Sequence, residues 1–188
     1  EMEIITIVLD GEMTHEDSMG NKTVIKTGDV QRMSAGTGLT HSEFNLAETP
    51  VHFYQIWIYP DESELEPTYD QRSYEPSEWK NTLLPVASGQ NLQNVVTFHT
   101  DATIYRCDLE AGRKITFDHT KERRVFVYVT KGQLSVNGQH IGEADQARVD
   151  VEEPMVLAAK QDAEFILIDV PSCKGWGYSD ETLGGGKK

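Results

Sequence analysis

The chain has 188 residues, enough for one large domain or two small ones with a real hydrophobic core. Its formal net charge of −14, spread along the sequence without a basic run, argues against nucleic acid and anionic membrane as partners. No stretch of about 18 apolar residues predicts a membrane span. The two cysteines, Cys107 and Cys173, lie far apart and do not make a disulfide framework, which favours a reducing, cytoplasmic location.

Strand patterns dominate the first sixty residues. Ile5, Ile7 and Leu9 alternate with Thr6, Val8 and Asp10, and a glycine at position 11 supplies the turn that follows. Short runs with strand character come next, at residues 23–25, 30–33, 41–45 and 51–59. The last of these, VHFYQIWIY, is rich in β-branched and aromatic residues and predicts a central strand.

Residues 60–95 lack a clear strand pattern and are rich in Pro, Glu, Asp, Ser and Asn, which predicts a connector between two β units. Within it, Pro76 to Trp79 could form one short turn or helix. Strands are then predicted at residues 94–99, 103–109, 124–129, 133–136, 155–158 and 164–169. Asn137-Gly138 is a strong two-residue hairpin signal within this series.

One pattern occurs in both parts of the chain. Val8 to Gly11 and Val129 to Gly132 each end a strand in a glycine turn, and a second turn follows each of them. Many short strands separated by glycine turns are typical of a sandwich or barrel. The sequence therefore predicts an all-β protein with two such units in tandem.

The best candidate for chemistry is the pair His41 and Glu43 in the segment SAGTGLTHSEFN. Residues two apart on a strand share a face, so both side chains would point the same way, as metal ligands do. Imidazole and carboxylate together suit Fe, Mn, Ni, Cu or Zn. Gly36 and Gly38 allow a tight turn before the strand, although an isolated H-x-E also occurs by chance on polar strand faces.

The other histidines give weaker signals. His15 lies in a hydrophilic hairpin and is expected at the surface, whereas His52 could face the interior from a central strand. His99 and His119 have acidic neighbours and are expected at exposed strand ends, and His140 is expected to be solvated after its hairpin turn. No phosphate loop, Ser/His/Asp signature or nucleophilic cysteine is found.

Three segments of the first sixty residues closely resemble the pirin-like family of bicupin proteins: MEIITIVLDGEMTHEDSMGNK, TGDVQRMSAGTGLTHSEFN and FYQIWIYP. The general cupin second motif is matched by Gly28, Gly38, His41 and Asn45, with two extra residues and no proline. Further along, ERRVFVYVTKGQLSVNG looks like the second cupin of such proteins.

The resemblance implies two tandem cupin barrels of double-stranded β-helix (jelly-roll) type. We expect an N-terminal cupin over residues 1–62, incomplete at its start, and a connector over 63–93. A C-terminal cupin without metal ligands is expected over 94–171, and a disordered tail over 172–188.

The metal site of pirin-like proteins usually has three histidines and one glutamate, and the resemblance assigns two of these ligands to His41 and Glu43. The family's other two histidines lie in an H-P-H segment just before the strand that here starts at Glu1, so we expect an upstream stretch to precede this sequence. The second cupin has no H-x-H or H-x-E segment at the matching positions, which are occupied by Asp118-His119 and Ala158-Ala159. It therefore resembles the metal-free second barrel of the family.

The resemblance implies one divalent transition metal, foremost Fe, with Mn, Ni, Cu, Zn or Co as alternatives. It also implies a quercetin 2,3-dioxygenase-like enzyme that opens flavonols with O₂, with Glu43 as the base that accepts the 3-hydroxyl proton. Two alternatives stay open: a regulatory protein that acts through protein partners, and a metal-free cupin whose pocket binds a small molecule.

Overall fold

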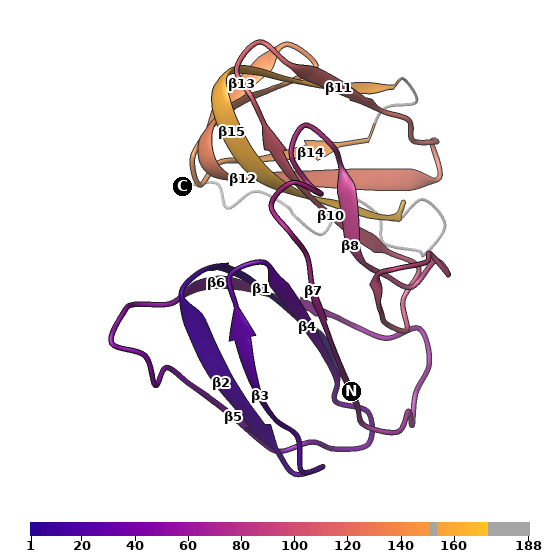
Figure 1. The fold of residues 1–188 in the computed structure, drawn as a ribbon. Helices are drawn as coiled ribbons and strands as arrows, with labels where there is room; N and C mark the ends of the chain where they lie inside the picture. The colour runs from indigo at the N-terminus through magenta and orange to yellow at the C-terminus, as the bar shows by residue number, and fades with distance from the viewer. Residues whose placement is uncertain (151–153, 173–188) are drawn as a thin grey trace, which may run out of the picture.

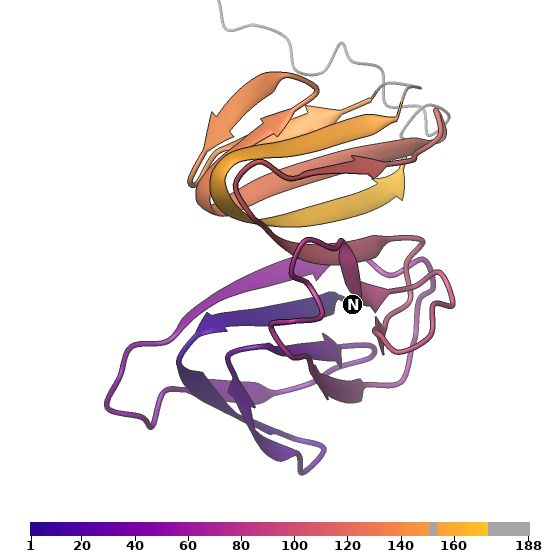
Figure 2. The same cartoon turned by 45° about the horizontal axis from the view of Figure 1, so that its top comes forward.

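The computed structural model describes residues 1–150 and 154–172. Seven strands form the N-terminal half (Figure 1), namely β1 (Glu3–Asp10), β2 (Glu12–Asp17), β3 (Lys22–Lys26), β4 (Asp29–Ser34), β5 (His41–Phe44), β6 (His52–Ile58) and β7 (Thr68–Ser73). They build two antiparallel sheets, with the strand orders β6-β1-β4-β7 and β3-β2-β5. The two sheets face each other as the two walls of one barrel-like unit, seen in the lower part of Figure 2.

Strand β1 is buried on both faces, which explains its nearly continuous apolar sequence. Ile5 and Ile7 pack outward against side chains from the C-terminal half, whereas Val8 packs inward with Met13 and Ile25. The sheet that contains β1 is therefore the middle layer of the molecule. One of its faces lines the N-terminal barrel and the other meets the second half.

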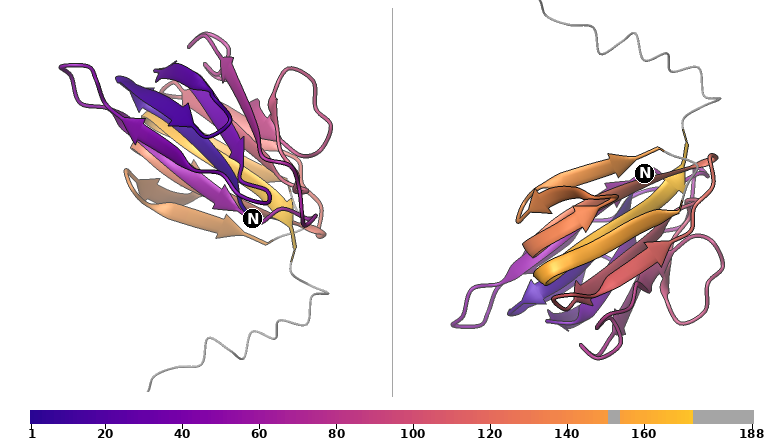
Figure 3. Two further views of the ribbon diagram at one scale, coloured as in Figure 1. Left: turned by 90° about the horizontal axis from the view of Figure 1, so that it is seen from below. Right: turned by 90° about the horizontal axis from the view of Figure 1, so that it is seen from above.

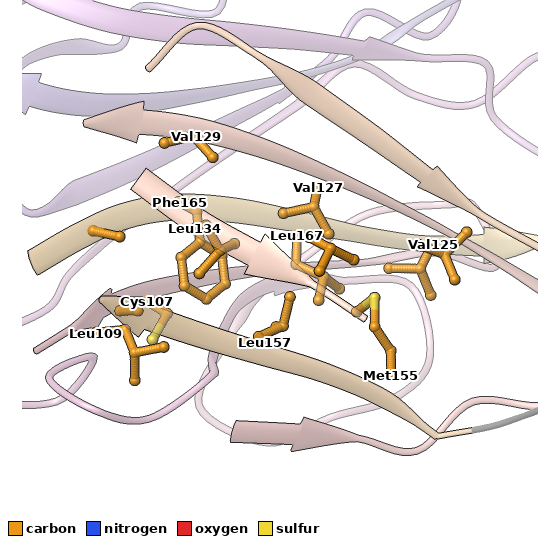
Figure 4. Close-up of a cluster of buried hydrophobic side chains, with 14 residues drawn as sticks. Cys107, Leu109, Val125, Val127, Val129, Leu134, Met155, Leu157, Phe165 and Leu167 are labelled. Carbon is orange, nitrogen blue, oxygen red and sulfur yellow. The ribbon is translucent and has the colours of Figure 1, made fainter. Parts of the chain in front are cut away.

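The C-terminal half is a single curled sheet of eight strands, which lies in front in the right-hand view of Figure 3. Its strands are β8 (Leu84–Ser88), β9 (Val96–Thr97), β10 (Thr103–Leu109), β11 (Lys114–Phe117), β12 (Arg123–Val136), β13 (Gln139–Gly142), β14 (Gln146–Val149) and β15 (Met155–Pro171). The long strands β12 and β15 pair along most of their length and bend at shifts in register. Figure 4 shows the apolar side chains that fill this unit, among them Val127, Leu157 and Phe165.

An apolar core joins the two halves. Ile5 and Ile7 of β1 share one cluster of buried side chains with Ile104 and Ile166 of the second sheet. Polar contacts border this junction: Arg32 donates from Nε to the carbonyl of Thr97 at 2.7 Å. The expected all-β architecture of tandem barrels is confirmed, and the halves are packed against each other.

The segment expected to be a connector contains strands of both halves. The span 63–93, for which we expected a connector, carries β7, which extends the first sheet beside β4, and β8, which pairs with β10. Within it, residues 75–78 form one turn closed by the amide of Glu78 donating to the carbonyl of Glu75. Of the expected tail over 172–188, only Ser172 is described, and its amide donates to the carbonyl of Glu122 at 2.7 Å; the remainder, including Cys173, lies outside the described residues. No helix in the described part could cross a membrane.

Candidate functional site

Two histidine–carboxylate pairs lie side by side on neighbouring strands. Strands β2 and β5 run antiparallel, and their register sets His15 opposite Glu43 and Asp17 opposite His41. Residues two apart on a strand share a face, and so do residues directly opposite on its partner. The four side chains therefore belong to one face of the β3-β2-β5 sheet.

The Glu43 carboxylate reaches the space between the two sheets of the N-terminal barrel. Gln55 of β6 donates from Nε2 to Glu43 Oε2 at 3.0 Å, and Gln31 of β4 donates from Nε2 to Oε1 at 3.3 Å. The Glu43 side chain is only 15% exposed. A carboxylate accepts hydrogen bonds at both oxygens, and here each oxygen accepts one from a glutamine. The two glutamines therefore fix the position of the Glu43 carboxylate.

His15 is fully buried, so the expectation of a surface residue was wrong. Its Nε2 lies 3.1 Å from Asp17 Oδ2, and its ring stacks on Tyr69 with centroids 4.9 Å apart. The reason is the register of β2, which turns His15 toward the barrel interior although its sequence neighbours are hydrophilic. Its Nδ1 has no hydrogen-bond partner and lies 3.9 Å from Glu43 Oε1.

Two neighbours of His15 have shifted pKa values. Burial raises the pKa of Asp17, but hydrogen bonds from the side chains of Asn21 and His15 and from the amides of Asn21 and Met19 outweigh it, so the net shift is downward. The Asp17 carboxylate is therefore an acceptor, and the proton on the His15 ring belongs to Nε2. Burial raises the pKa of Tyr69 to about 12, so its phenol stays protonated and donates to Gln71 at 2.8 Å.

His41 is exposed at the start of β5, and its ring centroid lies 5.8 Å from that of His15. The donor chemistry of His41 and Glu43, one imidazole and one carboxylate, fits a first-row divalent metal. Nε2 of the neighbouring His15 is bonded to Asp17, whereas its Nδ1, which has no hydrogen-bond partner, lies 3.9 Å from Glu43 Oε1. The described part of the chain contains no group of three or more His, Cys, Asp or Glu side chains placed to hold a metal ion.

The remaining histidines lie away from this site. His52 is exposed, and its ring meets Tyr54 edge-on, so the possibility that it faces the interior is wrong. His99 is exposed as expected, and its Nδ1 bonds to the buried Glu3 carboxylate at 3.0 Å. His119 is half-buried rather than exposed, and His140 is exposed as expected.

Sequence reasoning missed His15, Gln31 and Gln55. A signal for His15 was present, since His15-x-Asp17 has the same spacing as His41-x-Glu43, although the sequence predicted a hairpin rather than a strand at His15. No comparable signal exists for the two glutamines. They come from β4 and β6, on the opposite sheet, and only the closed barrel brings them to Glu43.

Comparison with known proteins shows which family the chain belongs to. Residues 1–58 match the family model described as Pirin, and residues 85–170 match the one described as Quercetinase C-terminal cupin domain. A protein named quercetin 2,3-dioxygenase from Escherichia coli K12 is 38% identical over 173 residues, which are 91% of this chain and 73% of that protein. The chain belongs to the pirin family.

Other relatives agree with that assignment. A pirin-like protein from Caulobacter vibrioides is 34% identical over 170 residues, covering 90% of this chain and 73% of its own length. The crystal structure of the Escherichia coli pirin YhhW in complex with nickel(II) matches with a TM-score of 0.83 and 36% identity, over 90% of this chain and 72% of that one. Both halves of this pirin-family chain are therefore cupin domains.

Proposed function

We propose that this chain is a metal-dependent dioxygenase of the pirin type that oxidatively opens flavonols such as quercetin. The observation that carries the proposal is the Glu43 carboxylate, held by Gln31 and Gln55 beside the exposed His41. It forms a fixed acceptor between the two sheets of the N-terminal barrel. Relatives of this chain are named quercetin 2,3-dioxygenase, some of them as putative enzymes, which supports the reaction class.

His41 and Glu43 are the residues of this chain that would hold the metal. When bound, a divalent ion, foremost Fe with Mn, Ni, Cu, Zn or Co as alternatives, would supply Lewis acidity toward the substrate oxygens. A redox-active ion such as Fe would also supply the redox chemistry that O₂ requires, which Zn does not. One solved relative was crystallised with nickel(II), which supports a divalent first-row metal.

Glu43 is the proposed base. Its Oε1 has the weaker of the two glutamine contacts, at 3.3 Å, and is the atom free to accept the proton of the flavonol 3-hydroxyl. The shorter bond from Gln55 keeps Oε2 in place while the proton moves. Further along the same face of β2, Met13 packs with Val8 and Ile25 in an apolar cluster inside the barrel.

The first test is Glu43→Gln, which keeps the size of the side chain and removes the base. We expect flavonol consumption in air to fall at least about a hundredfold, the lower end of what a general base contributes, with an unchanged circular dichroism spectrum. The control is Glu48→Gln, on the exposed loop after β5, which should keep wild-type turnover.

The measurement is the loss of the flavonol absorbance band, with metal content determined on the same samples. Wild-type turnover by Glu43→Gln would contradict the role of this residue. Metal uptake by the wild-type chain without any flavonol consumption would reject the dioxygenase and favour a regulatory protein that acts through protein partners.

A further inference from the structure

Strand β6 presents different side chains to its two sides. Tyr54, Ile56 and Ile58 pack against the core shared with the C-terminal half. The alternate positions turn the other way: Phe53 packs on the inner cluster of the barrel, and Gln55 reaches Glu43. Trp57 is next on this side of β6, and 62% of it is exposed.

Trp57 is connected to Glu43 by a chain of two hydrogen bonds. The indole Nε1 of Trp57 donates to Gln55 Oε1 at 2.8 Å, and Gln55 Nε2 donates to Glu43 Oε2 at 3.0 Å. An indole N–H only donates and a carboxylate only accepts, so the two ends of the Gln55 carboxamide cannot be exchanged. The amide orientation is thus set from both sides, and the indole has a fixed position relative to the carboxylate.

The exposure of this indole is unusual for a side chain so well anchored. A tryptophan buries a large apolar area when it packs, and its rigid ring provides stacking surface at low cost in side-chain entropy. Here the polar edge of Trp57 is satisfied by Gln55 while most of the side chain stays open to solvent. The hydrogen bonds through Gln55 are what connect this exposed ring to Glu43.

We propose that Trp57 is the substrate-recognition residue of this site, stacking on the flat ring of an aromatic substrate, and that Gln55 is the positioning residue that holds Glu43 relative to that ring. This deepens the proposed function, on which it rests for the role of Glu43. The substrate class is a planar, neutral polyphenol with a hydroxyl at the edge that faces the carboxylate, because Glu43, linked to Trp57 through Gln55, disfavours an anionic ring.

The first experiment measures binding alone. Quercetin is titrated into the metal-free chain and its absorbance shift gives Kd for the wild type, Trp57→Leu and Trp57→Phe. An aromatic contact of this kind corresponds to about three- to tenfold in Kd, so Trp57→Leu should weaken binding by that factor. Trp57→Phe keeps a flat ring and should stay within about twofold of the wild type.

Tyr59 offers a matched control, since it is 77% exposed, two residues further along the same segment, and has no hydrogen bond to Gln55 among the described contacts. Tyr59→Leu should leave Kd unchanged. Equal Kd values for the wild type and Trp57→Leu, or an equal loss with Tyr59→Leu, would overturn the assignment of Trp57.

The second experiment isolates Gln55. A side chain that positions a metal ligand typically contributes about ten- to a hundredfold to metal affinity, so Gln55→Leu should weaken Fe(II) or Ni(II) binding by about tenfold. Because Gln55→Leu also removes the acceptor of the Trp57 indole, quercetin Kd should rise as well, but by no more than in Trp57→Leu. Gln139→Leu, at an exposed glutamine of β13, is the control. Unchanged metal affinity in Gln55→Leu would overturn its positioning role.

The two proposals can fail separately. Trp57-dependent binding of quercetin by a metal-loaded chain that does not consume it would reject the dioxygenase and keep the recognition surface. Turnover with the same KM in Trp57→Leu as in the wild type would keep the enzyme and reject the surface.

Discussion

The Glu43 carboxylate is surrounded by polar side chains from three other strands: His15 of β2, Gln31 of β4 and Gln55 of β6. Buried polar groups are costly unless they are paired, and most of these are. The exceptions are His15 Nδ1 and Gln31 Oε1, both buried without a partner in the described contacts. Such unpaired atoms gathered next to one carboxylate are typical of a functional site rather than of a structural core.

His15 gives a prediction at this scale. His15→Ala removes a fully buried ring that stacks on Tyr69 and bonds to Asp17, so we expect a loss of about 2–4 kcal/mol in the free energy of unfolding. Urea titration followed by circular dichroism measures it. His140→Ala, at an exposed position, should change the free energy of unfolding by less than about 0.5 kcal/mol. Equal stability of the two variants would contradict the buried role of His15.

At the scale of elements, the loop that leads into β5 decides where His41 and Glu43 lie. The amide of Thr37 donates to the carbonyl of Leu65 at 2.9 Å, which fixes this loop on the segment before β7. Gly36 has a φ of +47°, and a Cβ there would lie 2.1 Å from the Leu65 carbonyl oxygen. Glycine is required at this position both for its backbone angle and for the close approach.

The loop prediction compares two glycines with positive φ. Gly36→Ala should lower the free energy of unfolding by about 3 kcal/mol, because strain and a collision with backbone add together. Gly20→Ala has φ +89° and nothing within 4 Å of the added Cβ, so it reports the strain alone, at about 1 kcal/mol. Thermal or urea unfolding measures the difference, and equal costs would show that Leu65 moves away freely.

At the scale of the whole molecule, the β6-β1-β4-β7 sheet belongs to both halves, since one face lines the barrel and the other packs on the second sheet. Arg32 is buried at this junction, and burial lowers its pKa against the opposing effect of Glu3 and Asp70. Its Nη1 donates to Ser34 Oγ at 3.1 Å, and Ser34 in turn donates to Glu3 at 2.7 Å. The halves should therefore unfold together.

Arg32→Leu tests this coupling. The change leaves the Glu3 carboxylate, which is 1% exposed, without its nearby positive charge, so we expect a loss of about 3–5 kcal/mol. The control is Lys131→Ala. The Lys131 side chain is 72% exposed and its ammonium lies 3.6 Å from Glu164, so its loss should change the free energy of unfolding by less than about 1 kcal/mol. A single guanidinium unfolding transition is expected in every case. Two separate transitions in the wild type would contradict a shared core.

Local patterns in the sequence determined a great deal. Period-two alternation predicted most strands, glycine turns predicted the repeated barrels, and the spacing of His41 and Glu43 set both on one face of β5. These features depend on neighbours within a few residues, so they can be read along the chain.

Only the tertiary structure decided the rest of the site. The burial of His15, the bonds from Gln31 and Gln55 to Glu43, and the link from Gln55 to Trp57 depend on how two sheets close on each other. Strand register and sheet packing join residues far apart in the chain, and no local pattern records them. His41 and Glu43 could thus be predicted from the sequence as a pair, whereas their surroundings required the fold.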